Sequence, residues 1–287
     1  MIVDRLTGQP CIECRTLALI GKGWAKGLTA ASDARVARAA AAHRGVRYRR
    51  RGHRKLRTGA SIEHAWSAEL AYALGLMATD GCLVGDRRHM SFGSEDRALV
   101  ETFRACIGLT TMIREVRTRT GGSYFRTQFG DVELYRWFES VGLTPRKSLT
   151  LGALAVPEAF LVEVTRGLLD GDGSILDFTY NGTGKARGHR YRTLITRFNS
   201  ASRSHLEWLR ERLRTSLGVY GGLSTSLVNG RNPFFHLSYA KRESMILLAR
   251  LYADRSAPCL LRKRDIWDRW RALSTAASPT LESGSAR

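Results

Sequence analysis

Two stretches of the chain resemble one another and decide the fold: AYALGLMATDG at residues 71–81 and EVTRGLLDGDG at residues 163–173. Both end in two apolar residues, two further residues and then Asp-Gly. Gly75 and Gly167 stand five residues before Asp80 and Asp172, respectively. A matched pair of this kind indicates an internal duplication of a whole structural unit.

The similarity continues downstream of each stretch. A β-rich segment of about two strands leads into an amphipathic helix, then into two more strands and a further helix. The amphipathic helices are marked by apolar residues at helical spacing: Leu99, Phe103 and Ile107 in the first copy, and Leu206, Leu209 and Leu213 in the second. The order predicts an α+β fold with two pseudo-twofold-related αββαββα repeats and antiparallel sheets.

These boundaries divide the chain into four parts. We predict a basic N-terminal extension over residues 1–65, a first repeat over 66–157 and a second repeat over 158–273. Both repeats close with a basic segment, TPRKSL at 144–149 and LRKRDIW at 261–267. Residues 274–287, STAASPTLESGSAR, have the composition of a disordered tail.

Small residues mark one face of each repeated helix. Gly75 shares a face with Ala71 and Thr79 at i, i+4 spacing, and Gly167 and Gly171 do the same in the second copy. A stripe of small residues lets two helix backbones approach closely. We therefore predict that the two repeated helices pack together at the interface between the repeats, through Gly75, Gly167 and Gly171.

The two aspartates are difficult to explain as structural residues. Each lies in the last turn of its helix, where the helix dipole disfavours negative charge. If the helices pair along their glycines, Asp80 and Asp172 also converge and repel one another. A divalent cation removes this conflict, since hard cations such as Mg²⁺ prefer carboxylate oxygens. The pattern predicts a metal site suited to phosphodiester hydrolysis.

The net charge indicates the class of partner. The 287 residues include 46 Lys+Arg and 26 Asp+Glu, a formal charge of +20. So large an excess fits a nucleic acid. No apolar run approaches the ~18 residues of a membrane span, so no membrane partner is expected. Five cysteines without a secretion signal favour a reduced, cytoplasmic protein, associated with the nucleoid if it is encoded by a bacterium or phage.

The densest positive charge lies in the N-terminal extension. The segment from Arg44 to Arg57 reads RGVRYRRRGHRKLR, and a short alanine-rich helix with Ser32 or Asp33 as N-cap is predicted before it. A solvated charge run and a DNA-binding arm are both compatible with this composition. Cys11 and Cys14 have zinc-knuckle spacing, but a four-ligand zinc site needs two more ligands, and the spacing of the available histidines fits no zinc pattern.

Strand alternation identifies candidate DNA contacts. In YFRTQF, Arg126 and Gln128 share one face while Phe125 and Phe129 take the other. Arg and Gln side chains suit bidentate contacts with guanine and adenine edges. Further candidates are Arg117 and Arg119 on the preceding strand, Arg190, Arg192 and Arg197 in the second repeat, and Arg49, Arg50 and Arg51 in the arm.

The repeated motif resembles that of the LAGLIDADG homing endonucleases. GLLDGDGSI at 167–175 is close to the family motif, and ALGLMATDG at 73–81 is a more divergent copy. SFGSEDRAL and GLTPRKS, between Ser91 and Lys147, resemble the usual continuation. The first copy has Ala78 where the second has Asp170. Since the family's metal ligand is the later acid, this departure weakens the match more than the mechanism.

The resemblance implies a site-specific double-strand DNA endonuclease of the monomeric, two-motif type. Its sheets would form a saddle over the DNA major groove, with the motif helices between the repeats. Asp80 and Asp172 would hold Mg²⁺, which Mn²⁺ can replace, with Gly81 and Gly173 included in the metal site. Lys147 and Lys263 occupy matching places and are candidate catalytic lysines. The expected substrate is a long duplex site, near-palindromic or asymmetric, cut to leave short 3′ overhangs.

Two alternatives use the same scaffold. One is a DNA-binding regulator that does not cleave, although a regulator would more readily carry asparagine or a small residue at 80 or 172. The other is an RNA maturase that assists the splicing of an intron, because a positive charge does not distinguish RNA from DNA.

Overall fold

The computed structural model describes residues 28–43, 66–118, 121–184 and 187–276. The chain divides into two units, residues 1–54 and 55–287. The first contains helix α2 (Ala34–His43), and its predicted N-cap is confirmed at Asp33, whose Oδ1 accepts a hydrogen bond of 2.7 Å from the Arg35 backbone N–H. The predictions for Cys11, Cys14 and the arginine-rich arm with Arg49, Arg50 and Arg51 lie outside the described residues.

The second unit has the predicted α+β order twice. The first repeat consists of α3 (Ala68–Thr79), β1 (Gly81–Leu83), β2 (His89–Ser94), α4 (Arg97–Cys106), β3 (Ile113–Arg117), β4 (Ser123–Gly130) and α5 (Val132–Ser140). The second consists of α6 (Leu161–Asp170), β5 (Ser174–Asn181), β6 (Arg190–Ser200), α7 (Arg203–Leu217), β7 (Gly222–Val228), β8 (Asn232–Tyr239) and α8 (Lys241–Leu251). The αββαββα pattern is therefore confirmed in both copies.

Each repeat builds one four-stranded antiparallel sheet. The strand order is β1-β2-β4-β3 in the first sheet and β5-β6-β8-β7 in the second. Helices α4 and α5 pack on one face of the first sheet, and α7 and α8 on one face of the second. The apolar side chains of alternate strand positions, such as Phe92 and Phe198, are buried under these helices. The other face of each sheet is not covered by these helices and carries polar residues.

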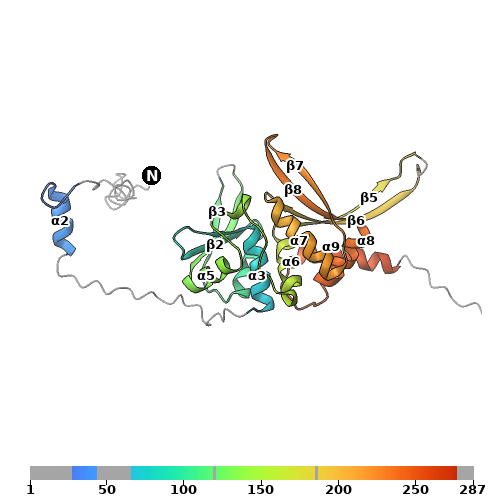
Figure 1. Ribbon diagram of the computed structural model, residues 1–287, viewed down its shortest axis with the longest axis horizontal. Helices are drawn as coiled ribbons and strands as arrows, with labels where there is room; N and C mark the ends of the chain where they lie inside the picture. Colours follow the sequence, from blue (N-terminus) through green and yellow to red (C-terminus); the bar gives the residue numbers. More distant parts are fainter. Residues whose placement is uncertain (1–27, 44–65, 119–120, 185–186, 277–287) are drawn as a thin grey trace, which may run out of the picture. The chain divides into compact units, whose positions relative to one another are not determined.

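Helices α3 and α6 lie side by side between the two sheets (Figure 1). Their backbones meet at the predicted glycines. A Cβ atom on Gly75 would lie 2.3 Å from the Val164 carbonyl oxygen, and one on Gly167 would lie 2.3 Å from that of Tyr72. At Gly171, a Cβ would lie 2.0 Å from Thr79 Oγ1. The helix interface predicted from these three glycines is therefore present.

The end of the second repeat differs from the prediction. The basic segment at 261–267 begins a helix, α9 (Leu261–Ala276), which runs past residue 273, where a disordered tail was predicted to follow. Lys263, Trp267 and Trp270 follow one another at i, i+4 and i+7 and are buried on one face of α9. The mainly basic composition of the segment gives little sign of this buried face. None of the described helices is long and apolar enough to span a membrane.

The glycine contact generates a first prediction. Replacing Gly75 with alanine places a methyl group against the backbone of α6, which cannot yield as a side chain would. We expect a loss of about 3 kcal/mol in the free energy of unfolding, the upper end of overpacking costs, measured by urea denaturation.

Gly152→Ala is the matched control, because a Cβ there has no heavy atom within 4 Å. Its free energy of unfolding should stay within about 0.5 kcal/mol of wild type. Equal effects of the two substitutions would contradict the close helix contact.

Candidate metal and nucleic-acid site

The two motif aspartates come together at the ends of α3 and α6. Asp80 is the C-cap residue of α3, and Asp172 follows α6 by two positions. Both side chains reach the solvent. Their charges are close enough for the Asp172 carboxylate to raise the pKa of Asp80. The structure therefore brings together the two acids that the sequence pattern singled out.

The surrounding protein makes ionisation of these acids unfavourable. Although the Asp80 side chain reaches the solvent, the protein packed around it removes part of its hydration. This burial, followed by the charge of Asp172, raises the pKa of Asp80 to about 7, and the nearby Lys147 and Lys263 act in the opposite direction. Burial also raises the pKa of Asp172, again against the effect of the two lysines. A cation placed between two such carboxylates would stabilise their charged forms.

Neither carboxylate has a hydrogen-bond or ion-pair partner in the described part of the chain. The backbone carbonyl of Asp172, in contrast, accepts a hydrogen bond of 2.7 Å from Asn199 Nδ2. Within the described ranges, no three His, Cys, Asp or Glu side chains gather closely enough to form a complete metal cage. The described residues thus present two carboxylates side by side without a protein partner.

The two predicted lysines lie at the matching ends of the motif helices. Lys147 Nζ donates to the carbonyl oxygens of Thr79 at 3.0 Å and Gly81 at 2.6 Å. Lys263 Nζ donates to carbonyl oxygens at 2.6–3.2 Å, those of Leu169, Asp170, Gly171 and Gly173. Their side chains are buried, and burial lowers the pKa of Lys263 to about 8. Each ammonium therefore caps the carbonyl end of a helix.

These contacts give Lys147 and Lys263 a positioning role, and their catalytic role stays a prediction. The ammonium protons of Lys147 and Lys263 are directed at backbone carbonyls, so these lysines act first by positioning the helix ends beside the aspartates. The carbonyls of Gly81 and Gly173 each accept a hydrogen bond from a positive ammonium. A metal ion held by the same oxygen would lie close to that charge, which argues against Gly81 and Gly173 as metal ligands.

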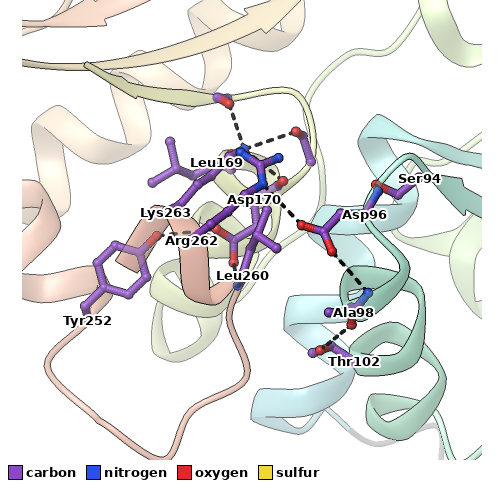
Figure 2. A network of polar contacts seen from close by, with 12 residues as sticks. Ser94, Asp96, Ala98, Thr102, Leu169, Asp170, Tyr252, Leu260, Arg262 and Lys263 are labelled. Atoms are coloured by element: carbon purple, nitrogen blue, oxygen red, sulfur yellow. Dashed lines mark hydrogen bonds and ion pairs between the residues drawn. The ribbon is translucent and has the colours of Figure 1, made fainter. Parts of the chain in front are cut away.

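Asp170 has a structural role that explains the difference between the two motifs (Figure 2). Asp170 is 1% exposed, and its carboxylate accepts a hydrogen bond of 2.8 Å from Tyr72 Oη. It also accepts hydrogen bonds from Tyr252 Oη at 3.3 Å and from the Leu260 backbone N–H at 2.7 Å, residues that Figure 2 shows around it. Tyr72 belongs to α3, and Leu260 precedes α9. Asp170 therefore ties the second motif helix to the first and to the start of α9, which carries Lys263.

The outer face of the first sheet carries Arg126 and Gln128, the pair predicted to contact DNA. Arg126 and Gln128 are exposed, whereas Thr127 and Phe129 point into the core. The strand register places Arg114 opposite Arg126 on this outer face, a candidate contact that alternation within one strand did not reveal. Arg117 pairs with Ser123 and so lies on the other face. The face that Arg117 was predicted to share with Arg119 stays a prediction, because Arg119 lies outside the described residues.

The second sheet separates the arginines that were grouped together. Arg197 lies on the outer face, where its Nε donates to Ser238 Oγ at 3.1 Å. Arg190 and Arg192 have the parity of the buried Leu194 and so lie on the opposite face. Arg192 forms an ion pair with Asp177, and its guanidinium lies 4.5 Å from the ring centre of Trp270. These contacts attach β6 to α9, and the role of Arg192 in DNA binding stays a prediction.

Solved structures resemble this fold, whereas no protein-family model and no curated protein sequence matches the chain. The meganuclease I-SmaMI, bound to uncleavable DNA, matches with a TM-score of 0.50 and 12% identity, over 74% of this chain and 92% of its own. The chain has the LAGLIDADG fold.

Two further matches are weaker. I-DmoI in complex with its target DNA and Mg²⁺ has a TM-score of 0.42 and 14% identity, over 65% of this chain and 97% of its own. The N-terminal LAGLIDADG domain of DUF199/WhiA has a TM-score of 0.43 and 14% identity, over 69% and 86% of the two chains. At these identities the likeness concerns the fold.

The different surroundings of the acids generate a second prediction. Asp170→Asn should lower the free energy of unfolding by about 1–3 kcal/mol, because an amide cannot accept all three hydrogen bonds. Asp80→Asn should leave the metal-free protein as stable as wild type or up to about 1 kcal/mol more stable, since both carboxylates reach the solvent and are screened. Urea denaturation with a chelator at pH 8 measures both.

The gain from Asp80→Asn should depend on pH. Because the folded pKa of Asp80 lies above its unfolded value, its ionisation penalty is absent below pH ~4 and complete above pH ~7. The advantage of the variant should therefore disappear as the pH falls through this range. A loss of several kcal/mol in Asp80→Asn would show that this acid is structural.

Proposed function

We propose that the chain is a divalent-metal-dependent, site-specific double-strand DNA endonuclease of the homing type. The observation that supports this proposal most strongly is the pair of unpartnered carboxylates, one from each repeat, at the ends of the two packed helices. The fold of a DNA-bound meganuclease supports DNA as the partner. A single chain contains both halves of the site, so we propose a monomer acting on cytoplasmic or nucleoid DNA.

The residues present fit a Mg²⁺ ion. Mg²⁺ is usually bound through one or two carboxylates, with water and phosphate oxygens completing its octahedron. Asp80 and Asp172 would supply the carboxylates, and Mn²⁺ could replace Mg²⁺. When bound, the metal would activate water and stabilise the leaving 3′-oxygen. With the two repeats related by a pseudo-twofold axis, each acid would serve one DNA strand, as cleavage of both strands requires.

The other residues would prepare and align the site. Lys147 and Lys263 hold the helix ends and place two positive charges beside the carboxylates, which opposes their mutual repulsion. Arg114, Arg126 and Gln128 would contact base edges or phosphates from the outer face of the first sheet, and Arg197 from that of the second. The arm with Arg49, Arg50 and Arg51 would add phosphate contacts and a strong salt dependence.

Cleavage of a randomised duplex library tests the proposal. With Mg²⁺, the wild-type protein should produce discrete double-strand breaks, detected by sequencing the ends. Asp80→Asn and Asp172→Asn should each reduce double-strand cleavage by more than about 100-fold, because losing a ligand should cost more than losing its outer-shell partner. Asp265→Asn, which removes an exposed acid on α9, is the matched control.

Two outcomes would contradict the proposal. Sequence-specific binding without breaks would identify a non-cleaving DNA-binding protein. Absence of DNA binding together with selective binding to structured intron RNA would identify a maturase.

A further inference from the structure

The second repeat contains a long β-ribbon that the first repeat lacks. Strands β5 and β6 stay paired from Ser174–Arg197 to Asn181–Arg190, whereas β1 in the first repeat has only 3 residues. The far end of the ribbon projects away from the helices of its repeat (Figure 1). The fold is duplicated without this extension, so the core does not require it.

Three aromatic side chains line one face of the ribbon. Phe178, Tyr180 and Tyr191 are 45%, 50% and 42% exposed. The ring centres of Phe178 and Tyr180 are 6.3 Å apart. Those of Tyr180 and Tyr191 are 5.7 Å apart, with the two ring planes inclined by 28°. Contiguous exposed aromatic rings are uncommon on a soluble surface and indicate a contact with a partner.

The strand register places this aromatic row on the outer face of the second sheet. Tyr180 is directly opposite Tyr191, and Ser174 is opposite Arg197 on the same face. The other face of the ribbon already has a partner, because Arg192 binds Asp177 and stacks on Trp270 of α9. The rings therefore continue the surface on which Arg197 was placed as a DNA contact.

The positive charge of the ribbon favours a nucleic acid as its partner. Residues 174–200 contain one acid, Asp177, against five basic residues, Lys185, Arg187, Arg190, Arg192 and Arg197. A two-stranded ribbon fits the major groove of duplex DNA. The apolar group on the major-groove edges of the bases is the thymine methyl, which apolar side chains contact. The positive charge of the ribbon suits the DNA phosphates, and its apolar rings suit the thymine methyl groups.

We propose that Phe178, Tyr180 and Tyr191 read thymine methyl groups at the outer end of the half-site bound by the second repeat. This inference rests on the proposed function, because it requires a duplex target. The strand rises about 3.4 Å per residue, and the duplex rises about 3.4 Å per base pair. Tyr180 lies six residues after Ser174. The aromatic side chains around Tyr180 would therefore contact base pairs about six positions farther from the centre of the site than the base pair beside Ser174.

Selection of bound duplexes without divalent metal tests the inference. Wild-type protein should enrich thymine at one end of its site, and the triple variant Phe178→Ala, Tyr180→Ala, Tyr191→Ala should lose only that preference. Tyr180→Phe with Tyr191→Phe should retain it, since the rings remain. Tyr220→Ala, which removes a ring that is 69% exposed outside the ribbon, is the matched control.

Deoxyuridine provides a readout at the level of one methyl group. Replacing each enriched thymine by deoxyuridine should weaken wild-type binding about fourfold per methyl, as burial of one such group predicts, and should leave the triple variant unaffected. A selected site whose thymines tolerate deoxyuridine would overturn the inference and leave the nuclease proposal intact. Failure of wild-type protein to select any duplex would overturn both.

Discussion

The backbone contact between α3 and α6 determines the geometry of the unit that contains the two repeats. Gly75 and Gly167 allow the two helices to approach until a Cβ on either would clash with a carbonyl oxygen of the other. Each helix continues directly into the first strand of its sheet. The same contact therefore sets the relation between the two sheets and brings Asp80 and Asp172 together.

The helix pairing brings negative charges together, and buried lysines reduce the resulting repulsion. Two carboxylates lie at helix ends that already carry partial negative charge. Buried lysines in matching places offset the charge of the terminal carbonyls. Only the second helix has the additional acid, Asp170, whose three hydrogen bonds connect it to α3 and to the approach to α9. The two halves thus share a plan and differ in how they are anchored.

The sequence was sufficient for the parts that repeat. The duplicated motif predicted the element order, the antiparallel sheets and the interface at Gly75, because helix spacing and small residues are local properties. The face of Arg117 relative to Arg126 depends on the register between β3 and β4, which neither strand records by itself. Arg192 and Arg197 are five residues apart on β6, so alternation alone already separates their faces. The roles of Lys147 and Lys263 depend on which distant carbonyls lie beside them, and no local pattern records this.

Manganese binding tests the central claim that Asp80 and Asp172 form one metal site. The measurement is electron paramagnetic resonance of Mn²⁺ titrated into the protein with duplex DNA. Wild-type protein should remove Mn²⁺ from solution, and the double variant Asp80→Asn, Asp172→Asn should lose this binding while remaining folded. Unchanged Mn²⁺ binding by the double variant would contradict the claim.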